Sequence, residues 1–265
     1  MNPLDQFKAL QRDHWTHFAP LQALTTMPGA RLVKHARVLP GTRLLDVGCG
    51  TGVVAVTAAR AGANVTGLDL TPELLQLARS NAETAGVSIE WHEGDVESLP
   101  FESGSFDIVT SQFGHMFAPR PEVAVGEMLR VLKPGGTIAF STWPPELFVG
   151  RMMALMGSYG PPPPAGVAAP PLWGDPNVIR VRLGDAVSGL TFDRGRVYVP
   201  ALSVQAYRKM FEGTGGMMVK LTKALAASDP AKLEEFLGAY HALTAEYFED
   251  NAVRQDFLMT RAIKR

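Results

Sequence analysis

The chain has 265 residues, 46% of them hydrophobic, and its 25 basic and 26 acidic side chains give a net charge of −1. This size suits one large α/β domain, and the balanced charge argues against nucleic acid as a partner. A single cysteine excludes an internal disulfide, and no cysteine–histidine cluster has the spacing of a metal site. We therefore expect no bound metal. The sequence also shows no apolar targeting segment and no run long enough to span a membrane, so we expect a cytoplasmic protein.

The first segment with a clear periodicity is residues 4–24, which predict an amphipathic helix with its aromatic and leucine side chains near one side. His14 and His17 lie three residues apart within it. They lack a third nearby ligand, so we interpret them as surface residues or as part of a cover over the site, and not as a metal site.

Residues 44–52 predict a buried strand that passes through a glycine turn into a helix over 53–61. Three glycines leave room for a ligand to approach the backbone of this turn: Gly48, Gly50 and Gly52. Nicotinamide enzymes favour G-x-G-x-x-G, but here the third glycine comes one residue early. Asp46, two residues before the first glycine, favours a positively charged group over a pyrophosphate. We interpret Cys49 as a small packing residue of the turn and not as a nucleophile.

A second strand, over 64–68, ends at Asp69. An acidic residue about twenty positions after the glycine turn can accept both hydroxyls of a ribose. The alternative is that Asp69 only supports the start of the following helix, for which Thr71 is the expected N-cap.

A third strand, over 88–92, leads to Asp95. At the end of this strand the Asp95 carboxylate is placed to accept the exocyclic amine of adenine, with Leu70 and Val96 enclosing the ring. Asp95 is equally well explained as a residue that forms a turn. A fourth strand follows over 106–110, and the loop after it contains several polar residues: Ser111, Gln112 and His115.

The sequence then predicts a helix over 121–132 and a fifth strand over 137–142, joined by a Lys-Pro-Gly-Gly turn. Residues 144–176 are rich in proline and form either a loosely ordered surface loop or an apolar flap over an acceptor pocket. Two further strands are expected, over 190–199 with a kink at 193–195, and over 254–263.

A long insertion, residues 200–250, separates these last two strands. Asp229 followed by proline predicts the start of a helix that carries a regular stripe of apolar and aromatic side chains. We expect most of this stripe to be core. The alternative for Tyr240 or Tyr247 is that its hydroxyl reaches a substrate.

Five of these segments together resemble the class I S-adenosylmethionine-dependent methyltransferases, most closely the branch that includes the ubiquinone/menaquinone biosynthesis C-methyltransferase. The matching motifs are LLDVGCGTG (44–52), VTGLDLTPELL (65–75), EGDVESLPF (93–101), SFDIVTSQFGHMF (105–117) and EMLRVLKPGGTIAFSTW (127–143). The resemblance implies a Rossmann-like α/β fold: a seven-stranded, mostly parallel sheet with the last strand antiparallel and helices on both faces.

The resemblance also implies S-adenosylmethionine as cofactor and S-adenosylhomocysteine as product. The glycine turn with Asp46 would surround the methionine portion, Asp69 the ribose, and the Asp95 region the adenine, while Ser111 or Gln112 would lie by the methionine amino group. The complete expected set is Asp46, Gly48, Cys49, Gly50, Gly52, Asp69, Leu70, Asp95, Val96, Ser111 and Gln112.

On this basis residues 1–265 form one methyltransferase domain. We expect residues 1–34 to form a helical cover and residues 35–143 to form the cofactor-binding core. Residues 144–176 are then the proline-rich insertion, and residues 200–250 are a helical lid between the last two strands.

The most suitable general base is His115, because it follows the fourth strand near the expected ligand site and an ordinary imidazole titrates at about pH 6.5. Its alternative role is to hydrogen-bond the loop. His14, His17 and Tyr159 are poorer candidates. A base is needed only if the methyl acceptor must lose a proton, because the sulfonium donor is already activated.

The expected partner is a small, largely apolar methyl acceptor whose acceptor atom and identity are left open, as is the oligomeric state. Apolar side chains with this potential are Met152, Met153, Met156, Trp173, Met217 and Met218. The motif typical of exocyclic amino methylation is absent, since residues 141–145 read Ser-Thr-Trp-Pro-Pro. The alternatives are a methyltransferase that acts on a macromolecule, a non-catalytic cofactor-binding regulator, and a nicotinamide-dependent oxidoreductase.

Overall fold

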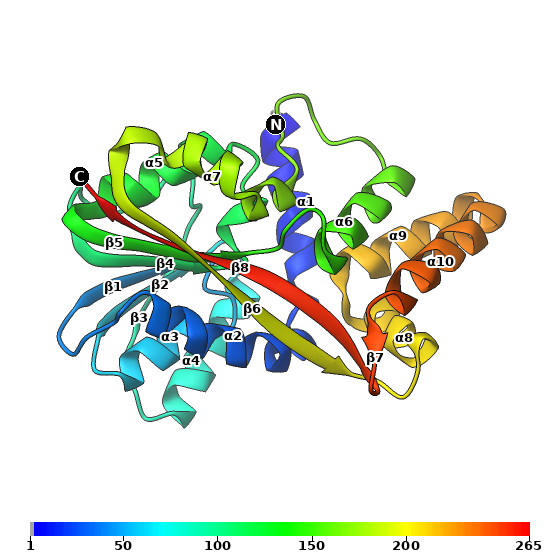
Figure 1. Ribbon diagram of the computed structural model, residues 1–265, viewed down its shortest axis with the longest axis horizontal. Helices are drawn as coiled ribbons and strands as arrows, with labels where there is room; N and C mark the ends of the chain where they lie inside the picture. The colour runs from blue at the N-terminus through cyan, green and yellow to red at the C-terminus, as the bar shows by residue number, and fades with distance from the viewer. Residues whose placement is uncertain (1–2) are drawn as a thin grey trace.

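A mixed β-sheet forms the frame of the molecule (Figure 1), and the computed structural model describes residues 3–265. Its main strands follow the order β3-β2-β1-β4-β5-β8-β6. They are β1 (Arg43–Val47), β2 (Asn64–Asp69), β3 (Glu90–Glu93), β4 (Phe106–Gln112), β5 (Leu132–Thr142), β6 (Val187–Pro200) and β8 (Ala252–Lys264), and a short β7 (Phe248–Glu249) pairs with β8. β1 to β5 pair in parallel, whereas β8 is antiparallel to both β5 and β6. The expected sheet, with its last strand antiparallel, is confirmed.

The central strand β1 explains why the sheet forms here. Leu44, Leu45 and Val47 are fully buried, as expected for a strand covered on both faces. The pairing of Val47 with Leu68 and of Asp46 with Thr110 brings the carboxyl ends of β1, β2 and β4 to one edge. Ligands of open α/β sheets bind outside this edge.

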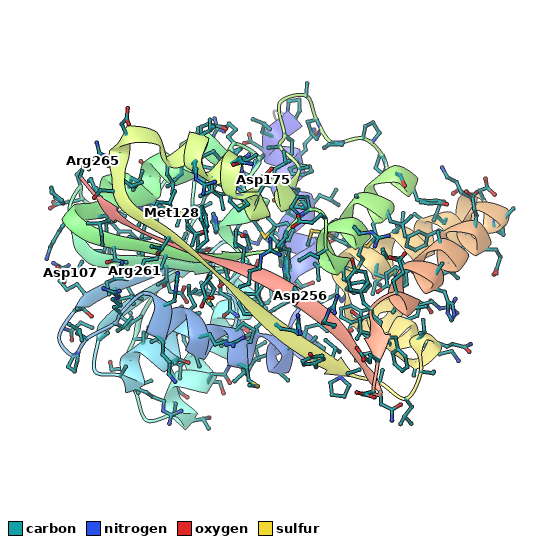
Figure 2. All side chains as sticks on the ribbon, viewed as in Figure 1. Asp107, Met128, Asp175, Asp256, Arg261 and Arg265 are labelled. Carbon is teal, nitrogen blue, oxygen red and sulfur yellow. The ribbon has the colours of Figure 1, made fainter. Side chains whose placement is uncertain are left out.

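Helices cover both faces of the sheet (Figure 1). One face carries α2 (Gln22–His35), α3 (Val53–Arg60) and α4 (Pro72–Thr84), and the other carries α5 (Pro121–Val131) and α7 (Pro176–Leu183). Met128 of α5 is fully buried in the core on its side (Figure 2). Among the helices that the structure describes, none is both long and apolar enough to cross a membrane.

A second core lies beyond the end of the sheet, in a group of helices that we call the helical lobe. The lobe consists of α6 (Phe148–Tyr159), α8 (Val204–Thr214), α9 (Gly216–Ser228) and α10 (Pro230–Ala245). Asp229 caps α10 by accepting a hydrogen bond from the Lys232 amide at 3.0 Å, as its position before a proline predicts. The long strands β6 and β8 extend from the sheet into this lobe (Figure 1).

The N-terminal segment is not the single helix expected over residues 4–24. It forms α1 (Pro3–Trp15), a short 3₁₀ turn over Ala19–Leu21, and then α2. The Thr16 hydroxyl donates to the Asp13 carbonyl at 2.8 Å, and Pro20 has no amide hydrogen to continue an α-helix. The break allows α1 to lie between the sheet and the helical lobe (Figure 1).

Three other boundaries differ from the sequence predictions. β5 begins at Leu132 instead of residue 137, because Leu132 pairs with Phe106 before the register shifts. The irregularity in β6 lies between Ser188 and Thr191 and not at 193–195, because Gly189 there adopts a φ of +59°. The proline-rich segment is not a loop throughout, since its first part forms α6.

Candidate active site

The carboxyl ends of β1, β2 and β4 open into a cavity of about 280 Å³. One wall comes from the glycine turn and the ends of these strands, and α1 contributes Lys8, Gln11 and Trp15. The opposite wall comes from α6, α8, α9 and α10 of the helical lobe. One space therefore joins the expected cofactor region to the insertion between the last two strands.

The glycine turn serves both access and packing. Gly50 has a φ of +55°, and a Cβ there would meet nothing within 4 Å, so this position faces open space in the cavity. Gly52 has a φ of +82°, and its Cβ would lie 2.8 Å from the Trp91 ring. Gly48 lines the cavity but Gly52 does not. Gly52 is therefore required for close packing, and its contact with a ligand stays a prediction.

Asp46 is buried at the base of the cavity, with 1% of its surface exposed. Its Oδ1 accepts a hydrogen bond from the Thr110 hydroxyl at 3.1 Å, whereas its Oδ2 has no partner among the described residues. Burial raises the pKa of this carboxyl to about 7. A cation bound in the cavity would both satisfy the free oxygen and favour the ionised form.

Asp69 is fixed by the backbone on both of its oxygens. Oδ2 accepts the Gly50 amide at 2.7 Å and Oδ1 accepts the Thr71 amide at 2.8 Å. Burial raises the pKa of the carboxyl, and these hydrogen bonds oppose that effect. Asp69 thus supports the start of α4, which is the role that the alternative prediction gave it. Each carboxylate oxygen of Asp69 has a further lone pair, so Asp69 can also accept hydrogen bonds from hydroxyl groups of a ligand in the cavity. Leu70, the next residue, also lines the cavity.

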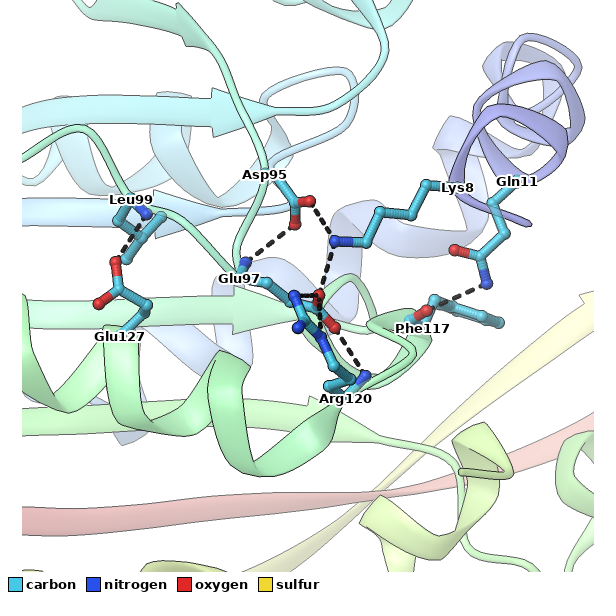
Figure 3. A network of polar contacts seen from close by, with 8 residues as sticks. All are labelled: Lys8, Gln11, Asp95, Glu97, Leu99, Phe117, Arg120 and Glu127. Atoms are coloured by element: carbon cyan, nitrogen blue, oxygen red, sulfur yellow. Dashed lines mark hydrogen bonds and ion pairs between the residues drawn. The ribbon is translucent and has the colours of Figure 1, made fainter. Parts of the chain in front are cut away.

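Asp95 and Val96 line the cavity, and Asp95 lies next to Lys8 of α1 (Figure 3). Oδ1 of Asp95 accepts the Glu97 amide at 2.9 Å, and Oδ2 forms an ion pair with the Lys8 ammonium at 2.5 Å. Lys8 also contacts Glu97 at 2.6 Å, and Arg120 donates to the same Glu97 oxygen at 2.9 Å and 2.8 Å. Asp95 therefore forms a turn, as one interpretation predicted, and also lines the cavity.

The Lys8 ion pair was not predicted from the sequence. Burial alone would lower the pKa of the Lys8 ammonium, but hydrogen bonds to Asp95 and Glu97 raise it above its ordinary value. The partners are 87 and 89 residues away in sequence. Helical periodicity identifies the face on which Lys8 lies but carries no information about such distant partners.

The polar residues after β4 divide into two groups. Gln112 lines the cavity, and its amide donates to the Thr25 carbonyl at 2.8 Å. Ser111 is fully buried outside the cavity lining, and its hydroxyl donates to the Val47 carbonyl at 2.6 Å. Of the two candidates for the methionine amino group, Gln112 is the one that lines the cavity, and its contact with the ligand stays a prediction.

Cys49 is 8% exposed within the glycine turn and lines the cavity. Burial raises the pKa of its thiol well above the ordinary value. The thiol is therefore protonated at neutral pH, which supports its interpretation as a packing residue.

His115 lines the cavity, as expected, but its imidazole is almost completely buried. Only 1% of its surface is exposed, and its ring packs against the rings of Phe140 and Trp173, at centroid distances of 4.6 Å and 4.7 Å. Burial lowers its pKa to about 3, so the expectation of an imidazole that titrates near neutral pH is corrected. A catalytic role for His115 stays a prediction.

The helical-lobe half of the cavity is mainly apolar. Its apolar side chains are Trp143, Val149, Met152, Met153, Met156, Phe211, Met217 and Met218, and its polar ones are Tyr240 and Gln255. Trp173 does not line it, because this side chain is buried against His115. Tyr159, Tyr247 and His17 also lie outside the lining, whereas His14 is part of it.

Comparison with known proteins agrees with this geometry. Residues 45–140 match the family described as the methyltransferase domain. An uncharacterized protein of Mycobacterium tuberculosis is 36% identical over 244 residues, which cover 89% of this chain and 86% of that protein. The chain belongs to the class I S-adenosylmethionine-dependent methyltransferases. It is therefore a methyltransferase whose cofactor is S-adenosylmethionine and whose product is S-adenosylhomocysteine.

Two further relatives of this methyltransferase differ in how much of it they cover. The ubiquinone biosynthesis O-methyltransferase of Xanthomonas campestris is 41% identical over 142 residues, covering 52% of this chain and 59% of that protein. A solved structure of a putative methyltransferase from Bacillus halodurans aligns with a TM-score of 0.60 and 22% identity, covering 89% of this chain and 98% of that one. The latter likeness shows the fold alone.

Proposed function

We propose that this methyltransferase acts on a small, largely apolar molecule bound in the helical-lobe half of the cavity. The observation that carries the proposal is that one cavity joins the glycine turn to a wall of methionine and aromatic side chains. Ligand sites of this kind are mostly apolar, with few polar groups to fix orientation. The relative named as an O-methyltransferase of ubiquinone biosynthesis agrees with an apolar acceptor.

The residues present fit the cofactor. The unpartnered Asp46 oxygen would hold the ammonium of the methionine portion, and Asp69 would accept the ribose hydroxyls. Leu70 and Val96 would enclose the adenine, with Asp95 at its amine edge. We assign these roles as proposals on the basis of burial and position in the cavity.

The bound cofactor supplies a methyl group already activated by a sulfonium. The task left to the chain is to align the acceptor with that methyl and to exclude water. Trp15 of α1 packs edge-on against Phe117 at 4.6 Å between ring centroids, and both side chains line the cavity. These aromatic rings cover the site on the α1 side. The cytoplasmic location and the lack of a nucleic-acid partner remain predictions.

The cofactor site is tested with Asp69→Ala. Loss of hydrogen bonds to the ribose should weaken S-adenosylhomocysteine binding by about 1.5–3 kcal/mol, measured by calorimetry, with the fold intact. Asp185→Ala, an exposed aspartate far from the cavity, is the matched control and should bind normally. An unchanged dissociation constant for Asp69→Ala would reject the assignment.

Catalysis is tested separately, by release of S-adenosylhomocysteine from S-adenosylmethionine with a panel of apolar phenols, quinols and related small molecules. We expect turnover with at least one of them and none with phosphorylated compounds of similar size. Tight cofactor binding without turnover on any acceptor would favour a non-catalytic regulator.

A further inference from the structure

Two buried polar side chains at the helical-lobe end of the cavity have no part in the cofactor assignment. Tyr240 on α10 is 0% exposed and Gln255 on β8 is 6% exposed, and both line the cavity. Apolar side chains surround them in the second core, among them Phe148, Met156 and Phe236. Buried polar groups in such surroundings need defined hydrogen-bond partners.

A third buried polar side chain, Tyr207, lies next to both of them. Gln255 Nε2 donates to the Tyr207 hydroxyl at 2.8 Å, and Tyr207, fully buried on α8, lies outside the cavity lining. The Tyr207 and Tyr240 side chains interact with each other, so this interaction reaches the cavity through Tyr240.

The hydrogen bond that Tyr240 makes within the protein is a weak one. It donates to the Met152 sulfur at 3.6 Å, and a thioether is a poor acceptor. Met152 also lines the cavity. Burial raises the pKa of both Tyr207 and Tyr240, so the two hydroxyls stay protonated at neutral pH and serve as donors, not as bases.

The charges near this chain argue against an ionised ligand. Among the described residues, Lys8 is the one lysine or arginine that lines the cavity, and its ammonium is bound to Asp95 and Glu97. Glu212, which faces Tyr240, is paired with Arg208 at 3.0 Å on the same helix. No free positive charge in the lining is therefore placed to hold a carboxylate or a phosphate.

We propose that the Tyr240 hydroxyl selects the methyl acceptor by donating a hydrogen bond to a neutral oxygen, so that the substrate is an apolar molecule with a carbonyl or similar group. Tyr207 is a positioning residue, because it interacts with Tyr240 and Gln255 from outside the cavity lining. This inference rests on the proposed function, since it describes the acceptor half of the same cavity.

The test compares two probes on the protein loaded with S-adenosylhomocysteine. Acetophenone and α-methylstyrene have nearly the same shape, but a carbonyl oxygen in the first replaces a methylene in the second. We expect acetophenone to bind the wild type about 3–10-fold more tightly, the range of one neutral hydrogen bond. Ligand-observed NMR titrations give both dissociation constants.

The variants distinguish the loss of a hydrogen-bond donor from a general loss of folded structure. Tyr240→Phe should abolish the preference for acetophenone, and Tyr207→Phe should reduce it in part. Tyr159→Phe is the matched control, because the Tyr159 hydroxyl donates to Glu235 outside the cavity. It should keep the full preference. The ratio between two probes is insensitive to a general loss of stability, and thermal melting identifies any variant that does not fold.

The other possible results contradict either the proposed function or the role of Tyr240. A wild type that does not bind S-adenosylhomocysteine overturns the proposed function and this inference together. Normal binding of S-adenosylhomocysteine with no preference between the probes, or with no binding of either, overturns the inference alone. The same holds if Tyr240→Phe folds and keeps the preference. If Tyr240→Phe does not fold, an unchanged preference in Tyr207→Phe overturns the inference.

Discussion

The buried carboxyl of Asp46 links cofactor binding to pH. Its pKa of about 7 means that it is partly protonated at neutral pH when no cation is present. An ammonium beside its free oxygen would lower that pKa, so binding would release a proton below pH 7. We expect the affinity for S-adenosylhomocysteine to fall between pH 7.5 and 5.5, approaching about tenfold per pH unit.

Calorimetry across this pH range gives the slope. Asp46→Asn cannot ionise and should bind more weakly at pH 7.5 but with little pH dependence. A wild-type affinity that is constant over the range would show that Asp46 does not pair with a cationic group of the ligand.

His115 should affect stability in acid. Its pKa is about 3 when folded and about 6.5 when unfolded, so between these values the unfolded chain binds the extra proton. The contribution of uncharged His115 to the free energy of unfolding is therefore fully present above about pH 6.5, and it is lost as the pH falls toward 3. Between pH 7.5 and 5.0 the free energy of unfolding should drop by about 2 kcal/mol from this residue.

Asp46 changes stability with pH in the opposite direction, but it does so equally in both the wild type and His115→Gln. Urea denaturation of the two proteins at both pH values therefore isolates the contribution of His115. The wild type should lose about 2 kcal/mol more than the variant. Equal losses would mean that His115 is protonated in the folded state. If His115 is also the base, turnover of the variant should fall about 10²–10⁴-fold at pH 7.5.

Individual residues differ in how far the sequence could predict them. The positions of Asp46, Gly50 and Asp69 were predictable, because each lies in a short segment whose strand, turn and helix are fixed locally. The surroundings of Ser111 and His115 were not, because these depend on where the chain brings Val47 and Trp173. A loop after a strand can turn its side chains toward the ligand or into the core.

At the scale of elements, α1 is a cover whose described residues all stay at least partly exposed. It is attached to the segment that follows β3 by the pairing of Lys8 with Asp95 and Glu97. Removing that charge should let α1 leave the cavity more often. We expect Lys8→Met to raise the dissociation rate of S-adenosylhomocysteine about 5–10-fold, the equivalent of one partly buried ion pair.

Stopped-flow displacement measures this rate. Arg12→Met is the matched control, because Arg12 lies on the same helix and its 3.2 Å contact with Glu93 is solvent-exposed. The control should leave the rate within about twofold. Equal rates for wild type and Lys8→Met would mean that α1 does not limit ligand release.

The elements themselves were predicted unevenly. The five parallel strands of the core were predictable from their apolar runs and the turns between them. The break before α2 was missed because the side chains on either side keep a helical spacing, although Pro20 gave a local signal. The break is what turns α1 away from α2 toward the helical lobe (Figure 1).

At the scale of the molecule, two cores are joined by one ribbon of strands. Val197 of β6 packs against the core on the α5 side of the sheet and against the core of the helical lobe, as does Trp143 after β5. Asp256 on β8 (Figure 2) forms an ion pair with Arg196 of β6 at 2.7 Å, which ties the two long strands together, and a second ion pair with Arg254 of β8 itself at 3.0 Å. The cavity lies between the cores, so its shape depends on this ribbon.

The way in which the helices α8 to α10 leave and re-enter the sheet has a consequence for how this protein can diversify. Pro200 and Ala252 are paired across β6 and β8, and the Ala201 amide donates to the Asn251 carbonyl at 2.8 Å. The whole excursion thus starts and finishes at neighbouring points of one hairpin. Exchange of this single contiguous stretch would therefore replace three of the four helices of the helical lobe at once and leave the main strands of the sheet continuous.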